Sequence, residues 1–202
     1  MIGVFDSGIG GLTVVRAIMQ CLPGYDVLYF GDTARTPYGS KSPATVSKYA
    51  IENTEFLISQ GAQAVVLACN TASSVAPDIL RQRYDIPFFE VITPAAEMAV
   101  QASRSGRIGI IGTRATVASG VYEKTIRHLK PECQVFACAC PLLVPLVEEG
   151  WLKKPETAMI VRKYLRPLKT THIDALILGC THYPLLIPLI EQIVQGRAAV
   201  ID

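Results

Sequence analysis

Two of the six cysteines lie where an apolar segment ends and small polar residues begin. Cys69 follows residues 64–68, Ala-Val-Val-Leu-Ala, and precedes Asn-Thr-Ala-Ser. Cys180 follows the apolar run 175–178 and Gly179, and precedes Thr-His. Small hydroxyl and amide residues cap helices, and a helix N-terminus stabilises a thiolate. We therefore expect each thiol to stand at the start of a helix, with a pKa below the ~8.5 of a free cysteine.

A matched pair of thiols suits one type of reaction. Inverting a stereocentre by proton transfer needs a base on one face of the carbon and an acid on the other, and the reverse reaction exchanges the two roles. If the two halves of the chain are related by a pseudo-twofold axis, Cys69 and Cys180 face each other and meet that need. Helix N-termini beside them would supply N–H donors for the carboxylates of a small zwitterion.

Short segments rich in Val, Ile and Phe alternate with helix signals along the chain. We expect strands at residues 2–5, 27–30, 64–68, 88–92, 107–111, 135–138, 175–178 and 198–201. Proline marks two helix starts, after Ser42 and at Pro155. The apolar stripes expected on these helices are Val46, Ala50 and Leu57, and Ile160, Tyr164 and Leu168. Strict alternation predicts parallel sheets, which bind ligands beyond the carboxyl ends of their strands.

The order of these segments repeats. Ile2 corresponds to Ile108 and Ala64 to Ala175, at offsets of about 110 residues, which indicates a duplicated architecture. The halves join near Thr93, where a strand gives way to a helix. We therefore expect an α/β fold of two pseudo-symmetric parallel-sheet domains, residues 1–94 and 95–202, that face each other across a cleft.

Composition limits the classes of protein. Of 202 residues, 50% are hydrophobic and 18% charged, and this excludes a disordered chain. The net charge of +2 carries no basic block, so no nucleic-acid partner is expected. The longest apolar runs are strand-sized and the N-terminus reaches Asp6 at once, so we expect neither a membrane span nor a signal peptide. Six irregularly spaced cysteines favour reduced thiols in the cytoplasm.

Several of the candidate residues and motifs also have a purely structural explanation. A single cysteine at a strand end is more often a small buried hydrophobe than a reactive group, and we keep that reading for Cys21, Cys133, Cys138 and Cys140. The spacing of Cys138-Ala139-Cys140 does not suit zinc. Residues 8–11, Gly-Ile-Gly-Gly, match a dinucleotide loop only weakly.

Each polar candidate can likewise be interpreted as structural or as part of the chemistry. Asp6 either caps the next helix or takes part in chemistry, and His182 is either a satisfied surface residue or tunes the nearby thiol. Glu148 and Glu149 either end an exposed helix or assist the site. Asp32 and Arg35 could form a local ion pair without chemistry.

At the strand-end loops the chain resembles the glutamate racemases, cofactor-independent members of the aspartate/glutamate racemase superfamily. Five segments carry the resemblance and span nearly the whole chain in order. They are Phe-Asp-Ser-Gly-Ile-Gly-Gly at 5–11, Gly-Asp-Thr-Ala-Arg-Thr-Pro-Tyr-Gly at 31–39, Ala-Cys-Asn-Thr-Ala-Ser at 68–73, Pro-Leu-Val-Glu-Glu-Gly at 145–150 and Gly-Cys-Thr-His-Tyr-Pro at 179–184.

The resemblance implies interconversion of L- and D-glutamate, which supplies D-glutamate for peptidoglycan, without a metal or pyridoxal phosphate. It implies that Cys69 removes the α-proton of the D form and Cys180 that of the L form. Asp6, Glu148 and His182 would assist the thiols, with Asp32 a less certain helper. The implied substrate contacts are Asp6, Ser7, Tyr38, Gly39, Asn70, Thr71, Thr113, Thr116, Thr181 and His182.

In the family the chain usually continues past the equivalent of Asp202 and returns to the first domain. That segment is absent from these 202 residues, so we expect part of the first domain to be uncovered. A homodimer is an assembly that the sequence leaves open.

Three other functions remain in competition. The same two thiols would serve a racemase of aspartate or of a hydantoin. A two-lobed module that binds an amino acid without chemistry would not need paired thiols. A nucleotide-binding switch domain is disfavoured because the glycine fingerprints fail.

Overall fold

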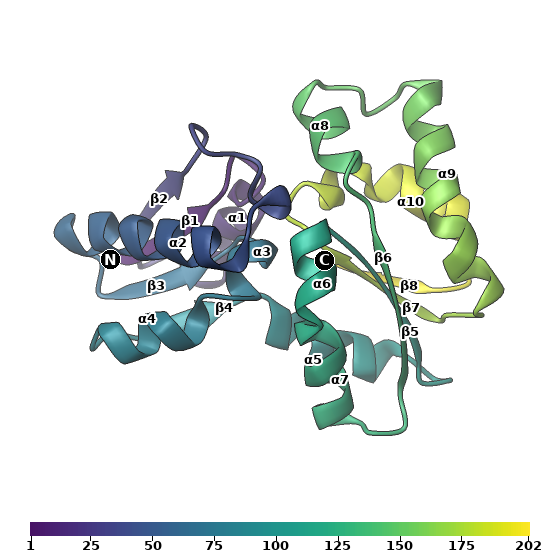
Figure 1. Ribbon diagram of the computed structural model, residues 1–202, viewed down its shortest axis with the longest axis horizontal. Helices are drawn as coiled ribbons and strands as arrows, with labels where there is room; N and C mark the ends of the chain where they lie inside the picture. The colour runs from purple at the N-terminus through teal and green to yellow at the C-terminus, as the bar shows by residue number, and fades with distance from the viewer. The chain divides into compact units, whose positions relative to one another are not determined.

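The computed structural model describes residues 1–202, which divide into two compact units, Met1–Val91 and Ile92–Asp202 (Figure 1). Each unit is built on one four-stranded parallel sheet. The predicted α/β class and the parallel strands are confirmed.

The first unit contains nine elements. In chain order they are β1 (Ile2–Asp6), α1 (Leu12–Cys21), β2 (Val27–Gly31), the 3-10 turn η1 (Tyr38–Ser40), α2 (Pro43–Ser59), β3 (Ala64–Leu67), α3 (Asn70–Ser73), α4 (Pro77–Arg83) and β4 (Phe88–Glu90), and the chain then enters α5 (Ile92–Ala102) of the second unit. The strand predicted at 88–92 ends early, because Ile92 already begins a helix and is buried.

The second unit continues from α5 with β5 (Arg107–Gly112), α6 (Arg114–Ser119), α7 (Val121–Leu129), β6 (Gln134–Ala139), α8 (Leu143–Glu148), α9 (Pro155–Thr170), β7 (Ala175–Gly179), the 3-10 turn η2 (Tyr183–Leu186), α10 (Ile187–Val194) and β8 (Ala199–Ile201). All eight predicted strands are present, with ends that differ by two residues at most.

The two sheets have the same topology. Their strand orders are β2-β1-β3-β4 and β6-β5-β7-β8, so β5 to β8 repeat β1 to β4. The register repeats as well, because Ile2 pairs with Ala64 and Ile108 pairs with Ala175. The duplicated architecture predicted from the sequence is therefore confirmed, and β3 and β7 occupy equivalent places.

Both faces of the second sheet are covered, and its strands alternate accordingly (Figure 1). Leu176 and Leu178 join the core formed with α8, α9 and α10. Ala175 and Ile177 point the other way, into the core with α5 and α7. A strand that is buried on both faces reads as a continuous apolar run, which is why 175–178 stood out in the sequence.

The first unit is covered less evenly. Its core lies between the sheet and helices α2, α3 and α4. Helix α1 contributes no fully buried residue, and Leu12, Met19 and Leu22 are 49%, 58% and 43% exposed. Leu12 and Met19 share one helix face, because positions seven residues apart align on an α-helix, and Leu22 follows directly as the C-cap of the helix.

The two helix starts form as predicted, but only one stripe does. Ser42 accepts a hydrogen bond from the Thr45 N–H and caps α2, whose Val46, Ala50 and Leu57 are fully buried. On α9 the prediction is confirmed for Leu168 but is about one position off for the rest of the stripe. The buried stripe there is Thr157, Val161, Leu165 and Leu168, while Ile160 and Tyr164 are only half-buried.

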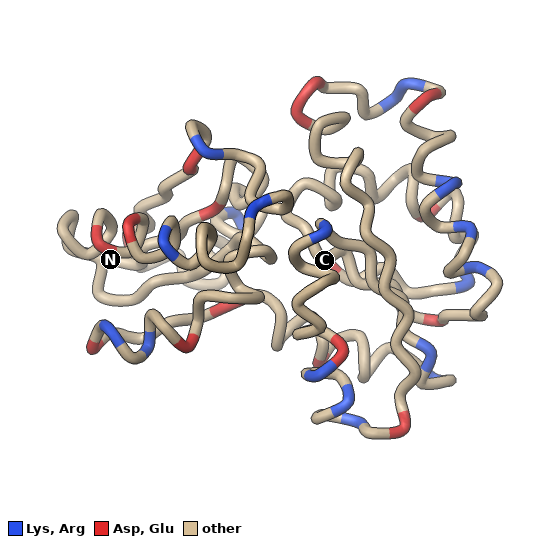
Figure 2. The backbone as a smooth tube through the Cα atoms, viewed as in Figure 1, with Lys and Arg blue, Asp and Glu red and all other residues tan.

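Charged residues of both signs are scattered along the backbone of both units (Figure 2). None of the helices combines the length and the apolar character needed to cross a membrane.

Candidate active site

The first predicted thiol lies at the carboxyl end of β3. Cys69 is 4% exposed and forms the N-cap of the short helix α3. The Ser7 hydroxyl and the backbone N–H groups of Thr71 and Ala72 donate hydrogen bonds to its sulfur. These donors stabilise a thiolate, as the sequence predicted for this position.

Burial reverses the predicted pKa of this thiol. Burial in the core and then the Asp6 carboxylate raise the pKa of Cys69 to about 12, against the three hydrogen bonds that lower it. The expectation of a lowered pKa is therefore wrong for Cys69. A helix of four residues offers a small dipole, and it cannot offset full desolvation together with a neighbouring negative charge.

Asp6 ends β1 and is fully buried, beside the strand that leads to Cys69. Its Oδ2 atom accepts hydrogen bonds from the N–H groups of Gly8 at 3.1 Å and Gly11 at 3.0 Å. A Cβ atom on Gly11 would lie 2.5 Å from the Asp6 Cβ, so this loop needs glycine there. Asp6 therefore organises the loop that leads into α1 and places a carboxylate near the Cys69 thiol, while its part in the chemistry stays a prediction.

A buried polar network holds the loop that follows β2. Tyr38 is 1% exposed, and its hydroxyl donates to Asp32 and accepts from the Asn53 amide at 3.0 Å. Arg35 pairs with Asp32 at 2.7 Å, donates to Asn53 at 2.9 Å and also pairs with Glu52. Burial, followed by the bond to Asp32, raises the pKa of Tyr38, so the phenol stays neutral. The predicted ion pair of Asp32 and Arg35 therefore exists as part of a larger network that fixes Tyr38.

The second predicted thiol lies at the carboxyl end of β7. Cys180 is 6% exposed, and its sulfur lies 3.8 Å from Nδ1 of His182, which is itself 2% exposed. The other ring nitrogen of His182 hydrogen-bonds Oε1 of Glu148 at 2.5 Å. Thiol, imidazole and carboxylate thus form a chain through which a proton can pass from the sulfur to the ring.

Glu148 and Glu149 lie at the same helix end but differ in their contacts. Glu148 is the last residue of α8, and its side chain is 33% exposed while it holds His182. Glu149 follows the helix, is exposed and forms no side-chain hydrogen bond or ion pair. Only Glu148 is positioned to assist the thiol.

The remaining predicted contacts also lie at strand ends. Thr113 follows β5 and caps α6, where its hydroxyl accepts from the Thr116 N–H at 3.2 Å. Thr113, Thr116 and Thr181 are 7%, 1% and 6% exposed. In the first unit, Asn70 and Thr71 begin α3 and are buried, and Gly39 lies in η1. Each sheet therefore gathers its share of the predicted residues at its own carboxyl edge.

Sequence reasoning missed two residues that support these sites. Asn53 lies on the buried face of α2, three residues from Ala50, and holds the Tyr38 hydroxyl. A polar residue within an apolar helical stripe was the available signal. Tyr29 of β2 donates from its hydroxyl to the Gly8 carbonyl at 2.5 Å, and nothing in its local sequence indicated that contact.

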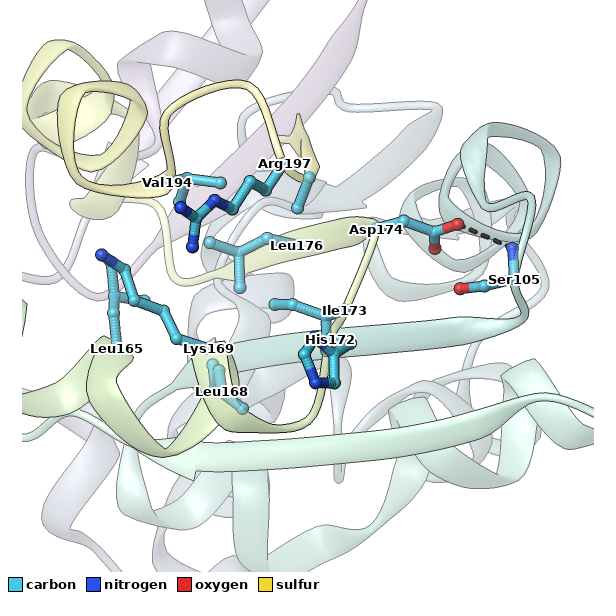
Figure 3. Close-up of a pocket in the computed structure, with 11 residues that line it drawn as sticks. Ser105, Leu165, Leu168, Lys169, His172, Ile173, Asp174, Leu176, Val194 and Arg197 are labelled. Carbon is cyan, nitrogen blue, oxygen red and sulfur yellow. Dashed lines mark hydrogen bonds between the residues drawn. The ribbon is translucent and has the colours of Figure 1, made fainter.

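A cavity of about 390 Å³ lies elsewhere in the second unit (Figure 3). It is bordered by Ile173 and Asp174 before β7, by Leu168 near the end of α9 and by Val194 at the end of α10. It therefore opens at the amino ends of the strands, opposite the edge that carries Cys180. No predicted site residue lines it.

A sequence model of the Asp/Glu/Hydantoin racemase family matches residues 2–202. The chain belongs to this racemase family. It is 50% identical to the glutamate racemase of Chlorobaculum tepidum over 202 residues, which are 100% of this chain and 74% of that protein. It is 49% identical to the glutamate racemase of Syntrophus aciditrophicus, with the same shares covered.

Solved racemase structures share the fold. The glutamate racemase isoform RacE1 of Bacillus anthracis has a TM-score of 0.96 at 40% identity, over 100% of this chain and 76% of that one. The glutamate racemase of Francisella tularensis, solved in complex with D-glutamate, has a TM-score of 0.93 at 41% identity, over 100% of this chain and 75% of that one. Both comparisons agree with the predicted family.

Proposed function

We propose that this chain interconverts L- and D-glutamate by proton transfer between two thiols, Cys69 and Cys180, without a metal or organic cofactor. The observation that carries the proposal is the placement of these thiols at equivalent strand ends of two sheets with the same topology. Relatives at about 50% identity over the whole chain are glutamate racemases.

The residues around Cys180 in the second unit suit the removal of a proton from L-glutamate. His182 accepts the thiol proton of Cys180 at Nδ1, and Glu148 stabilises the resulting imidazolium through Nε2. The thiolate then removes the α-proton. The electron pair left on the carbon delocalises into the adjacent carboxylate, which the neighbouring polar groups stabilise.

The residues around Cys69 in the first unit suit the delivery of a proton to the substrate. Because its pKa is raised to about 12, Cys69 is a thiol at neutral pH and can protonate the opposite face of the carbon, which forms D-glutamate. In the reverse direction Cys69 must act as the base. Ser7, Thr71 and Ala72 then stabilise its thiolate by hydrogen bonds.

Short polar groups around the two thiols would hold the substrate. Ser7, Asn70 and Thr71 in the first unit, and Thr113 and Thr181 in the second, are buried at the strand ends where a zwitterion would bind. We assign the remaining predicted contacts, Tyr38, Gly39, Thr116 and His182, to the same role. The D-glutamate formed would supply peptidoglycan.

The proposal is tested by incubating the protein with L-glutamate in D₂O, with EDTA present and without added cofactor, followed by chiral analysis. D-Glutamate that carries deuterium at the α-carbon is the expected product. A parallel incubation with L-aspartate measures which side chain is preferred. Absence of racemisation, activity lost only upon chelation, or a requirement for pyridoxal phosphate would contradict the proposal.

A further inference from the structure

The cavity at the amino ends of the second sheet lies apart from the proposed chemistry (Figure 3). Its volume of about 390 Å³ falls within the range of about 300–1,000 Å³ that small-molecule sites occupy. Aliphatic side chains form its walls, and they come from α9, the loop before β7, β7 itself and α10: Leu165, Leu168, Ile173, Leu176 and Val194. Apolar walls give water few hydrogen-bond partners, so such a cavity favours an apolar occupant. An alkyl chain is the chemistry that matches these walls.

Two cations without a partner border the same cavity. Lys169 lies in the last turn of α9, Arg197 lies between α10 and β8, and both are exposed. Neither side chain forms a hydrogen bond, an ion pair or a contact with an aromatic ring. Figure 3 shows both side chains extending toward the same side of the cavity. They therefore place two positive charges beside an apolar space.

These cations are not needed to cap the two helices that end beside the cavity. The Leu168 carbonyl accepts hydrogen bonds from the Thr171 N–H at 3.3 Å and from the Thr171 hydroxyl at 2.8 Å. The Val194 carbonyl accepts from the backbone N–H of Arg197 at 3.2 Å. Carbonyls at these helix ends thus have partners in the adjoining backbone and in a hydroxyl, and both cationic side chains stay available to a ligand.

The only carboxylate that borders the cavity is already satisfied. Asp174 accepts hydrogen bonds from the Ser103 hydroxyl at 2.5 Å and from the N–H groups of Arg104 at 2.8 Å and Ser105 at 2.6 Å. In Figure 3 its carboxylate turns toward Ser105, away from the two cations. Asp174 therefore holds the loop between α5 and β5 and leaves the positive charge at the cavity unpaired.

We propose that this cavity binds an aliphatic carboxylate, a molecule with one anionic head group and an alkyl chain. The chain lies between the leucine, isoleucine and valine walls, which removes apolar surface from water. The carboxylate binds Arg197, whose planar guanidinium can donate two parallel hydrogen bonds, and Lys169 adds a second positive charge. Glutamate does not match this site, because it carries two carboxylates and an ammonium group on a short chain. The proposal is therefore independent of racemisation at the opposite edge of the sheet.

The test uses octanoate as the probe, with 1-octanol and octylammonium as matched ligands that carry the same chain. Protein with ¹³C-labelled Leu, Ile and Val methyl groups is titrated with each ligand and followed by NMR. We expect octanoate to shift the methyl signals of Ile173 and Leu176 and to leave those of Val46, in the core of the first unit, unchanged. At low salt it should bind about fivefold or more tightly than 1-octanol, and added salt should shrink that difference. Octylammonium should bind most weakly.

Variants separate the charge from the apolar walls. Arg197→Gln and Lys169→Gln should each lower the affinity for octanoate toward that for 1-octanol, while 1-octanol binds as before and so reports an intact cavity. The matched control is Lys163→Gln, because Lys163 is exposed on α9 but does not border the cavity. It should bind octanoate as the wild type does.

Three results would overturn the proposal. Equal affinities for octanoate and 1-octanol would show an apolar cavity without a carboxylate site. Octanoate shifts confined to methyl groups outside the cavity, such as that of Leu12 on α1, would place the ligand elsewhere. Displacement of octanoate by L-glutamate would assign the cavity to the substrate. Each result is obtained whether or not the chain racemises glutamate.

Discussion

At the scale of single residues, the clearest chemical feature is the pair of contacts that joins Cys180 to His182 and His182 to Glu148. All three residues were predicted as candidates from the sequence, and the structure links them by contacts of 3.8 Å and 2.5 Å. What the sequence could not predict is the pKa of Cys69. Its position before a helix is visible in the residues, but its burial and the nearby Asp6 carboxylate arise only when β1 pairs with β3.

Glu148→Gln should lower kcat for racemisation about 10-fold or more, because an amide stabilises the His182 imidazolium less well than a carboxylate. KM should change little, since Glu148 is assigned to the thiol and not to the substrate. The matched control is Glu149→Gln, which removes the adjacent charge without touching His182. Equal losses in the two variants would show that only the overall charge matters.

Asp6→Asn should shift the pH profile of Cys69 alkylation to lower pH. Removing the neighbouring negative charge lowers the pKa of the thiol, so more thiolate is present at each pH below about 12, while burial keeps the pKa above its ordinary value. The measurement is the rate of iodoacetamide labelling of Cys69 between pH 7 and about pH 10, by peptide mass. An unchanged profile would remove Asp6 from the electrostatic account of this thiol.

At the scale of elements, most of the fold could be predicted because its signals are local. Each strand is a short apolar run, and Ser42 with the following proline marks the start of α2. The stripe of α9 could not be found by hydrophobicity. Its buried face includes Thr157, whose hydroxyl donates to the Trp151 carbonyl at 2.6 Å, so a satisfied polar residue occupies a core position.

Ser42→Ala should destabilise the first unit by about 1 kcal/mol, because the N–H of Thr45 loses its capping partner. Chemical denaturation followed by circular dichroism measures the change. Ser59→Ala is the control at the other end of α2, where the exposed hydroxyl donates to the Phe56 carbonyl of its own helix and accepts a long bond of 3.4 Å from the neighbouring Gln60 amide. A Ser42→Ala variant as stable as the control would exclude a capping role.

At the scale of the whole molecule, the duplicated topology was predictable from the spacing of apolar segments, and the common strand order confirms it. The sequence did not predict which apolar side chains of the first unit are exposed, among them Leu12 and Met19 of α1 and Leu22 just after it, and the expected uncovered region of the first domain stays a prediction. Exposed apolar residues in one contiguous group favour association.

Met19→Lys should therefore reduce binding of a hydrophobic dye and concentration-dependent association without loss of stability. Met159→Lys is the matched control, because Met159 is 63% exposed on α9 and lies outside this group. Light scattering over a range of protein concentrations gives the readout. If both variants lower association equally, the effect comes from added charge and not from the α1 face.

The central claim is that each of the two thiols transfers protons on one face of the substrate's α-carbon. It is tested most directly by exchange of the α-proton in D₂O, followed by NMR for each enantiomer. We expect Cys180→Ala to lose racemisation in both directions while it still slowly exchanges the α-proton of D-glutamate with retained configuration. Cys69→Ala should exchange only L-glutamate. Near-wild-type racemisation by either variant, or exchange of the same enantiomer by both, would contradict the account.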